Sequence, residues 1–462
     1  MKPKYFLALG LLVLGLGSCG ESFFEQYPSN NITEGNFYKT DDDFNQGVVA
    51  CYAKLKTQMS FHLTEIGYRG DENVLESMAV STQNRYDIDH FAETANNGIL
   101  NDIWNAWYNG IYRCNDVLDH MTGAKIANYD KYRGECLFLR SWWYFNLYRV
   151  FGVVPITRTV VTPAAAKLIP RCTEEEMYTL LTEDLAEAAR LLPPTPGPEK
   201  ARVANIAAYT LLAKVYLTFG KPAEAKTVLE EAMKNTAYGL ETTTKRVFDV
   251  SNKMNKEIIF ALYYNKTNDN GHGYWYSANT DVLADINNPT PTFKAIYDSE
   301  KDNRLPLISS YTKIKDNLFA MTKWYDTYDA TYTTQVGNDF PHLRYADVVL
   351  MYAEALAESG GSLGDALEWL NKTRTRAGLD ELTTDEVKSL AEFRRELAAE
   401  RGREFALEGH RWFDLVRLGL AVDYFREMGY SLDSHNLIFP IPQNQIEIVN
   451  NPSILWQNPG FN

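Results

Sequence analysis

The stretch that decides the fold is RYADVVLMYAEALAESGGSLGDALEWLNKTRTRAGL at residues 344–379, followed after a polar turn by FRRELAAERGREFALEGHRWFDLVR at residues 393–417. Apolar residues in the first part recur at helical spacing, stop at Gly360-Gly361 and resume at Ala366. The small side chains of Ala353 and Ala366 allow two antiparallel helices to approach closely. We therefore predict a helical hairpin, with the Arg- and Glu-rich second part forming a helix docked against it.

The same spacing occurs in two earlier parts of the chain. Five positions at offsets 0, 3, 4, 7 and 11 end on a glycine in each copy: Ser141, Tyr144, Phe145, Tyr148 and Gly152; Tyr209, Leu212, Ala213, Tyr216 and Gly220; Val349, Tyr352, Ala353, Leu356 and Gly360. A patterned helix face followed by a turn glycine is typical of tetratricopeptide helix pairs. The sequence predicts a mainly α fold, a tetratricopeptide-like helical solenoid interrupted by insertions, and such solenoids usually dock other proteins.

Charge and composition narrow the class of partner. The 462 residues include 46 Lys and Arg against 60 Asp and Glu, which gives a net charge of −14. Nucleic-acid binding needs a basic footprint, so we expect no nucleic-acid partner. Aromatic residues make up 13% of the chain, enough to fill a core and also to form planar binding surfaces.

The first 18 residues read as a lipoprotein signal peptide. Lys2 and Lys4 precede FLALGLLVLGLG, a hydrophobic run too short to span a membrane as a mature helix. The run ends in Leu16-Gly17-Ser18-Cys19, which looks like a lipoprotein processing site with Cys19 as the lipidated residue; a cleaved secretory signal with a chance cysteine is the alternative. Spacing leaves open whether the other cysteines form disulfides or are small core residues: Cys51, Cys114, Cys136 and Cys172.

Helical periodicity marks further segments on either side of polar loops. We expect helices over residues 41–59, 100–121, 132–151 and 173–192, the last opened by a capping box. A polar, aperiodic loop over residues 67–91 holds Asp71, Asn73, Arg85 and Tyr86. The Pro- and Asn-rich C-terminus cannot form a long helix, so we expect an extended tail pinned by Ile438, Phe439, Ile446 and Trp456.

Helical period fades over residues 237–343, where we expect a short strand at residues 258–264 and a loop-rich insertion. Two aromatic clusters lie among polar residues there: Tyr274-Trp275-Tyr276, and Trp324 and Tyr325 with Tyr328. Aromatic faces stack on the C–H face of a pyranose while amides and carboxylates bond its hydroxyls, so we predict platforms bordered by the polar loop. The alternative is that these aromatics merely hold a long loop in place.

Signals of catalysis are weak. The HExxH and P-loop patterns do not occur, and the seven His lack metal-ligand spacing, so we expect no cofactor, no metal and no enzymatic activity. A glycosidase would need two carboxylates about 5 to 9.5 Å apart across a cleft. The nearest candidates lie among arginines and are interpreted as a structural ion-pair network: Glu404, Glu408, His410 and Asp414.

Several segments, in this order, resemble the SusD/RagB family of outer-membrane lipoproteins of Bacteroidetes-type bacteria. They are the lipobox with FFEQYP, WNAWYNGIYRCN, YRGECLFLRSWWYFNLYRVFGVVPI, RYADVVLMYAEALAE with LNKTRTRAGL, ERGREFALEGHRWFDLVR and FPIPQNQIEIVNNPSILWQNPGF. The resemblance implies four tetratricopeptide-like units that carry a variable loop-rich region. It also implies a surface substrate-binding partner of a SusC-like TonB-dependent transporter, anchored to the outer membrane by its lipid.

The resulting hypothesis is one SusD-like domain that captures oligosaccharide at the cell surface without catalysis. Its parts are a signal peptide at 1–18, an N-terminal helical region at 19–236, the ligand-binding insertion at 237–343 and a C-terminal unit with tail at 344–462. Peptide capture by the same fold is the alternative, and it would favour backbone-pairing edges over aromatic platforms. A purely structural adaptor would explain the repeats but not the aromatic loops.

Overall fold

The computed structural model describes residues 37–72, 83–265, 277–279, 289–315, 318–326 and 337–461. Its longer helices are α2 (Asp41–Gly67), α4 (Gly98–His120), α5 (Tyr129–Phe151), α7 (Glu174–Leu191), α8 (Asn205–Thr218), α9 (Pro222–Met233), α13 (Tyr345–Glu358), α14 (Leu363–Arg376) and α15 (Leu390–Glu404). Its shorter helices are α3 (Gln83–Asp89), α6 (Pro163–Ala166), α10 (Thr244–Val247), α11 (Pro291–Lys294), α12 (Leu305–Ser309), α16 (Arg411–Arg417), α17 (Ala421–Glu427) and α18 (Gln443–Val449), with 3-10 turns η3 (Val250–Asn252), η5 (Thr322–Trp324) and η6 (Ser434–Leu437).

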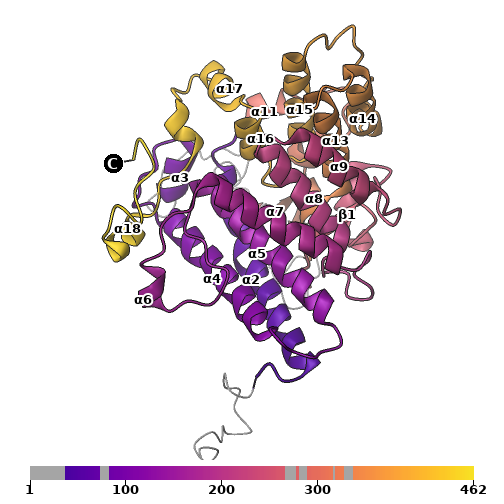
Figure 1. The fold of residues 1–462 in the computed structure, drawn as a ribbon. Coiled ribbons are helices and arrows are strands. Elements are labelled where there is room, and N and C mark those ends of the chain that lie inside the picture. Colours follow the sequence, from indigo (N-terminus) through magenta and orange to yellow (C-terminus); the bar gives the residue numbers. More distant parts are fainter. Residues whose placement is uncertain are drawn as a thin grey trace, which may run out of the picture.

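The longer helices form a stack of antiparallel pairs. α2 packs on α4, α5 on α7, α8 on α9 and α13 on α14, and neighbouring pairs meet through α4–α5, α7–α8 and α9–α13 (Figure 1). This arrangement confirms the predicted mainly α, tetratricopeptide-like solenoid. The contact between α9 and α13 joins two units that are separated in sequence by the insertion.

The three turn glycines picked out by the repeat share a positive φ. Gly152, Gly220 and Gly360 have φ values of 73°, 67° and 83°. This left-handed region carries little cost only for glycine, so each glycine ends its helix and lets the chain reverse. The repeated spacing therefore marks a position that needs a positive φ as well as an apolar helix face.

Helix boundaries follow the predictions in most places. Thr173 caps α7 in a full capping box with Glu176, as expected. The predicted helix at residues 41–59 extends to Gly67. The loop predicted over 67–91 is partly wrong, because residues 83–89 form α3, whose Ile88 and Asp89 are buried.

The Arg- and Glu-rich stretch forms two helices, α15 and α16, where one was expected. Leu407 and Gly409 have φ values of 64° and 76°, which break the helix. The buried Lys323 ammonium fixes this turn by donating to the Ala406 carbonyl and by pairing with Glu408 Oε1 at 2.7 Å. Lys323, the residue that stabilises this turn, is thus distant from it in sequence.

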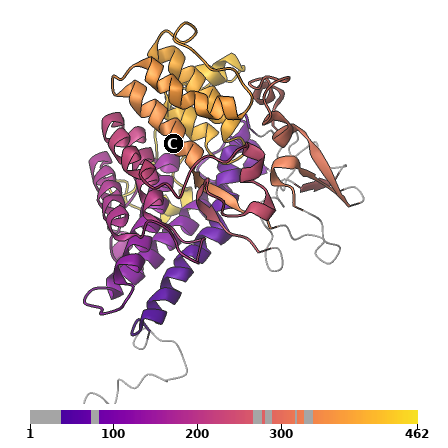
Figure 2. The ribbon, with the colours of Figure 1, turned by 90° about the vertical axis from the view of Figure 1, so that its right-hand side faces the viewer.

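Two small antiparallel sheets lie in the predicted insertion. The first pairs β1 (Ile258–Leu262), the strand expected from sequence, with β5 (Phe340–Arg344). The second has the order β2 (Ser277–Asn279), β4 (Leu318–Met321), β3 (Tyr311–Lys315). Figure 2 shows the β3–β4 hairpin projecting from the side of the helical stack.

The core runs through the helix pairs and includes buried cysteines from several elements. Cys51, Cys114 and Cys136 come from α2, α4 and α5, and Cys172 precedes α7; all four are free thiols. Within the described ranges, no helix is at once long enough and apolar enough to cross a membrane.

The C-terminal tail packs on the first helix pairs, as predicted, but it is not extended throughout, because residues 443–449 form the short helix α18. Phe439 is fully buried, and its N–H donates to the Val150 carbonyl at 2.9 Å. Ile438 and Ile446 are half-buried. Trp456 is 40% exposed, so it pins the tail only through the Arg171 guanidinium, 4.8 Å from its ring centre.

Candidate ligand-binding site

The structure describes part of the site predicted from sequence. Asn73, Tyr274-Trp275-Tyr276 and Tyr328 lie outside the described residues, as does the predicted lipidation residue Cys19. The described members of the prediction are Asp71, Arg85, Tyr86, Trp324 and Tyr325.

Asp71, which the sequence predicted to bond ligand hydroxyls, is buried and engaged by protein side chains in the structure. Asp71 is only 2% exposed, and Arg411 donates to both of its carboxylate oxygens, at 2.9 Å and 3.3 Å. The Tyr424 hydroxyl donates to the same carboxylate. The carboxylate therefore ties the end of α2 to α16 and α17, a link across about 350 residues that no local pattern reveals.

The neighbouring Glu72 is also buried, at 2% exposure. Burial and the adjacent Asp71 carboxylate raise the pKa of Glu72 to about 8, although Arg411 partly offsets them. Glu72 is thus neutral at pH 7, and it can donate as well as accept a hydrogen bond.

Trp324 is not the exposed platform that the sequence predicted. Its side chain is 1% exposed and packs edge-on to Phe248, with ring centres 5.2 Å apart, and against Phe340 at 6.2 Å. Its polar sequence neighbours concealed this, because Lys323 is buried too, through its ion pair with Glu408. Tyr325 is half-buried, and its carbonyl accepts a hydrogen bond from Asn338 at 3.3 Å.

Arg85 and Tyr86 lie half-buried on α3. The Tyr86 ring stacks on His90 with centres 3.8 Å apart. The start of α4 holds this helix, since the Asn97 amide donates to the Asn84 carbonyl at 2.9 Å. The predicted polar border is therefore partly a helix docked on the solenoid, while Trp324 and Tyr325 pack near the β1–β5 sheet.

A pocket of about 640 Å³ lies beside Asp71, between α15 and α17. Ile296, Ala398 and Leu420 supply apolar wall, and Arg411 and Tyr424 face it beside Asp71. The rim is charged: it is formed by Arg395, Asp423, Arg426 and Glu427. A half-buried tyrosine ring beside exposed hydrogen-bonding groups is the combination that a polyhydroxylated ligand needs.

The predicted insertion contacts the helical scaffold at this pocket. The Thr290 hydroxyl donates to the Asp71 carbonyl at 2.9 Å, just before α11, and Ile296 lines the pocket. Sequence reasoning missed Tyr424 because its helix looks like ordinary surface. Tyr424 can be assigned to the site only from its proximity to Asp71, which is seen in the folded structure and not in the sequence.

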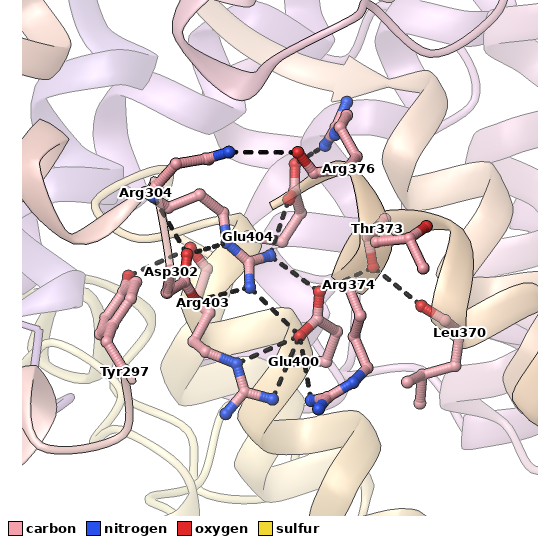
Figure 3. Close-up of polar contacts among 12 residues, drawn as sticks. Tyr297, Asp302, Arg304, Leu370, Thr373, Arg374, Arg376, Glu400, Arg403 and Glu404 are labelled. Carbon is pink, nitrogen blue, oxygen red and sulfur yellow. Dashed lines mark hydrogen bonds and ion pairs between the residues drawn. The ribbon is translucent and has the colours of Figure 1, made fainter. Parts of the chain in front are cut away.

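Carboxylates of α15 form a buried network beneath this region (Figure 3). Glu400 pairs with Arg304 at 2.7 Å and Arg403 at 3.1 Å, and accepts a hydrogen bond from Thr373 at 2.7 Å. Burial by itself would raise the pKa of Glu400, but Arg304 and Arg403 outweigh it and hold the pKa below its ordinary value. This carboxylate is therefore ionised and structural.

Arg344 joins the network to the first sheet. Its guanidinium pairs with Glu404 at 2.6 Å, Glu257 at 2.7 Å and Glu408 at 2.8 Å. On α16, Asp414 pairs with Arg401 at 2.7 Å. These pairs confirm the interpretation of the Arg-rich stretch as an ion-pair network. In the ranges described above, no cluster of His, Cys, Asp and Glu has the geometry of a metal site.

Two family models match most of the chain between them. The SusD family model matches residues 303–461, and a SusD-like model described as "Starch-binding associating with outer membrane" matches residues 27–217. SusD-like protein P2 of Formosa agariphila is 26% identical over 99% of this chain and 100% of its own length. The starch-binding protein SusD of Bacteroides thetaiotaomicron is 33% identical, over 31% of this chain and 26% of its own.

Solved structures share the whole architecture. Surface glycan-binding protein A from Bacteroides thetaiotaomicron, in complex with laminarihexaose, has a TM-score of 0.75 at 22% identity, covering 91% of this chain and 99% of that one. At this identity the likeness concerns the fold. Family models at both ends, a relative aligned over its full length and the common helical scaffold agree: this chain belongs to the SusD/RagB family.

Proposed function

We propose that this chain is a non-catalytic, cell-surface lipoprotein that binds oligosaccharide and delivers it to a TonB-dependent outer-membrane transporter. The observation that carries the proposal is the fold shared, over 91% of the chain, with a surface glycan-binding protein that was solved with laminarihexaose. The pocket beside Asp71, with its tyrosine face and charged rim, supplies suitable chemistry for a sugar in the described part of this chain.

The proposed site combines this pocket with the insertion. Tyr274-Trp275-Tyr276, Tyr325 and Tyr328 are the proposed platforms, and Asn73, Arg85 and Tyr86 the proposed polar contacts. Because Asp71 and Trp324 are both buried, the proposal gives them a supporting role in place of direct ligand contact. Asp71 is already engaged by Arg411 and Tyr424, which suits a holding role better than acid–base chemistry.

The decisive experiment is a panel of oligosaccharides and peptides, titrated by calorimetry into the soluble protein that lacks Cys19. We expect an oligosaccharide to bind and to be recovered intact by chromatography after prolonged incubation. Hydrolysis would overturn the non-catalytic assignment. Binding by peptides alone would replace the glycan by the peptide class that the same fold can support.

The residues of the site are tested by a matched pair of substitutions. Trp275→Ala should weaken binding of the oligosaccharide found in the panel by about 2 kcal/mol, as for the loss of a central hot spot. Trp456→Ala removes another indole, 40% exposed on the C-terminal tail, and should leave binding unchanged. Equal affinities for both variants would exclude Trp275 from the site.

Anchoring and delivery need cellular tests. Cys19→Ala should release the protein from the membrane fraction of cells that lack the partner transporter, because the lipid supplies the anchor. Affinity-tagged wild type from its native host should copurify with a TonB-dependent transporter. A purified complex that contains no such transporter would remove the delivery step from the proposal.

A further inference from the structure

A second pocket, of about 520 Å³, lies on the other side of α16. Arg411 and Leu415 of α16 line the pocket beside Asp71, whereas Phe413 and Arg417 line this one. The remaining walls come from α5, α8 and the tail at residues 437–438. The two pockets are therefore separate cavities that share one short helix.

Arg149 of α5 is the residue of this second pocket that could bind an anionic group. Its guanidinium carbon lies 3.9 Å from the centre of the Phe413 ring and 4.7 Å from that of Phe145. It donates to the side-chain oxygen of Asn146, while its Nε is buried without a hydrogen-bond partner. Among the residues that the structure describes, no carboxylate forms an ion pair with Arg149, unlike Arg304 and its neighbours in the network.

The other cations of the pocket are already neutralised. Lys214 pairs with Asp347, and Arg417 pairs with Asp414 and Glu354. His410, which also lines the pocket, is neutral, because burial and the nearby Lys214 keep its pKa well below the ordinary value.

At the mouth, the exposed Glu174 carboxylate accepts a hydrogen bond from the Tyr148 hydroxyl at 3.0 Å. In the interior of the pocket Arg149 has no ion-pair partner among the described residues, although the Asp414 and Asp347 carboxylates act on it at longer range. Burial of the guanidinium lowers the pKa of Arg149 to about 9, because these two carboxylates offset the cost of desolvation only in part.

We propose that this second pocket binds a small organic carboxylate, with Arg149 as the anchor for the carboxylate group. Its volume falls in the range of about 300–1,000 Å³ usual for small-molecule sites. The apolar body of the ligand packs against Leu437, Ile438 and Val153. Because aromatic rings cover the guanidinium, the carboxylate approaches its edge, the geometry that favours charge-assisted hydrogen bonds.

The test titrates the soluble full chain without Cys19, in a buffer free of carboxylate and phosphate. The probes are glucuronate and 3-phenylpropionate, each compared with its neutral counterpart, glucose and 3-phenylpropanol. We expect at least one acid to bind about tenfold or more tightly than its counterpart, as for a hydrogen bond to a charged group. A preference for glucuronate identifies a sugar acid, and a preference for 3-phenylpropionate an apolar acid. If neither acid exceeds its counterpart, the proposal is overturned.

Two variants then locate the site. Arg149→Met removes the charge, and Thr218→Phe fills the pocket from α8 without touching that charge. Both should weaken acid binding at least tenfold. Arg190→Met is the matched control, since Arg190 pairs with Glu187 on the exposed surface of α7. If Arg149→Met fails to fold, Thr218→Phe still decides: wild-type affinity in that variant would contradict the proposal.

Discussion

The carboxylate of Asp71 holds the C-terminal helices against the end of α2, so its removal should unfold more than a loop. Asp71→Ala leaves the Arg411 cation, itself 4% exposed, without its carboxylate partner. Breaking one side of a buried pair typically costs about 3–5 kcal/mol, which we expect in the free energy of unfolding measured in urea.

The control for that measurement is Asp423→Ala. Asp423 pairs with Arg426 on the surface, where its side chain is 78% exposed, and such pairs contribute at most about 1 kcal/mol. An Asp71→Ala protein of normal stability that no longer binds glycan would restore Asp71 to the ligand contacts predicted from sequence.

The raised pKa of Glu72 predicts a stability effect with a definite direction. The unfolded chain ionises Glu72 near its ordinary pKa, whereas the folded chain keeps it neutral up to about pH 8. Folding therefore loses stability as pH rises between those values. Glu72→Gln removes this cost, so it should raise the melting temperature more at pH 8 than at pH 5, by the equivalent of about 1 kcal/mol or more. A gain independent of pH would show that Glu72 ionises normally.

At the scale of the elements, the turn glycines are the most direct test of the repeat. Gly360 has φ of 83° with open space around its Cα, so a methyl group meets no neighbour and only the backbone is strained. Gly360→Ala should destabilise the protein by about 1 kcal/mol in thermal or urea unfolding. Gly239→Ala also enters open space, but without a positive φ, and should not destabilise it. Equal effects would show that Gly360 carries no strain.

The elements that could be predicted from sequence are those stabilised by residues that lie close together in the sequence. The hairpin α13–α14 and the capping box at Thr173 are encoded by spacing and by side chains within a few residues. The break between α15 and α16 depends on Lys323, about 80 residues away, and α3 on contacts with the start of α4. The nearby sequence does not predict these two features, because residues far away in the chain stabilise them.

For the whole molecule, the buried ion pairs predict sensitivity to acid. Burial opposes ionisation of Glu404 and Asp414, yet their arginine partners hold both pKa values far below the ordinary range. Their stabilisation is therefore complete above the unfolded pKa of about 4, and it is lost progressively as pH falls from there toward the lowered folded pKa values.

We expect the melting temperature to fall by about 5 °C or more between about pH 5 and pH 2. Because the pairs are buried, the fall should be similar at 0.1 M and 1 M NaCl. A fall that disappears at high salt would assign the acid sensitivity to surface charges.

At the candidate site, contacts between distant parts of the molecule explain why the sequence did not predict the burial of some residues. Polar neighbours made Trp324 look exposed, but its environment is set by Phe248 and Phe340 from other strands and turns. Asp71 looked free because Arg411 and Tyr424 follow it by about 340 and 350 residues. Composition indicates which residues suit a sugar, whereas tertiary packing decides which of them are available.

The four free cysteines have a practical consequence for spectroscopy. Cys51, Cys114, Cys136 and Cys172 are each at most 9% exposed, so a maleimide dye reaches them slowly while the chain is folded. In the protein without Cys19, a single cysteine introduced at the exposed Leu168 would react first. One fluorophore there, paired with another on a transporter, would report docking by energy transfer without replacement of the native thiols. Dye uptake by those thiols on heating would give an independent readout of unfolding.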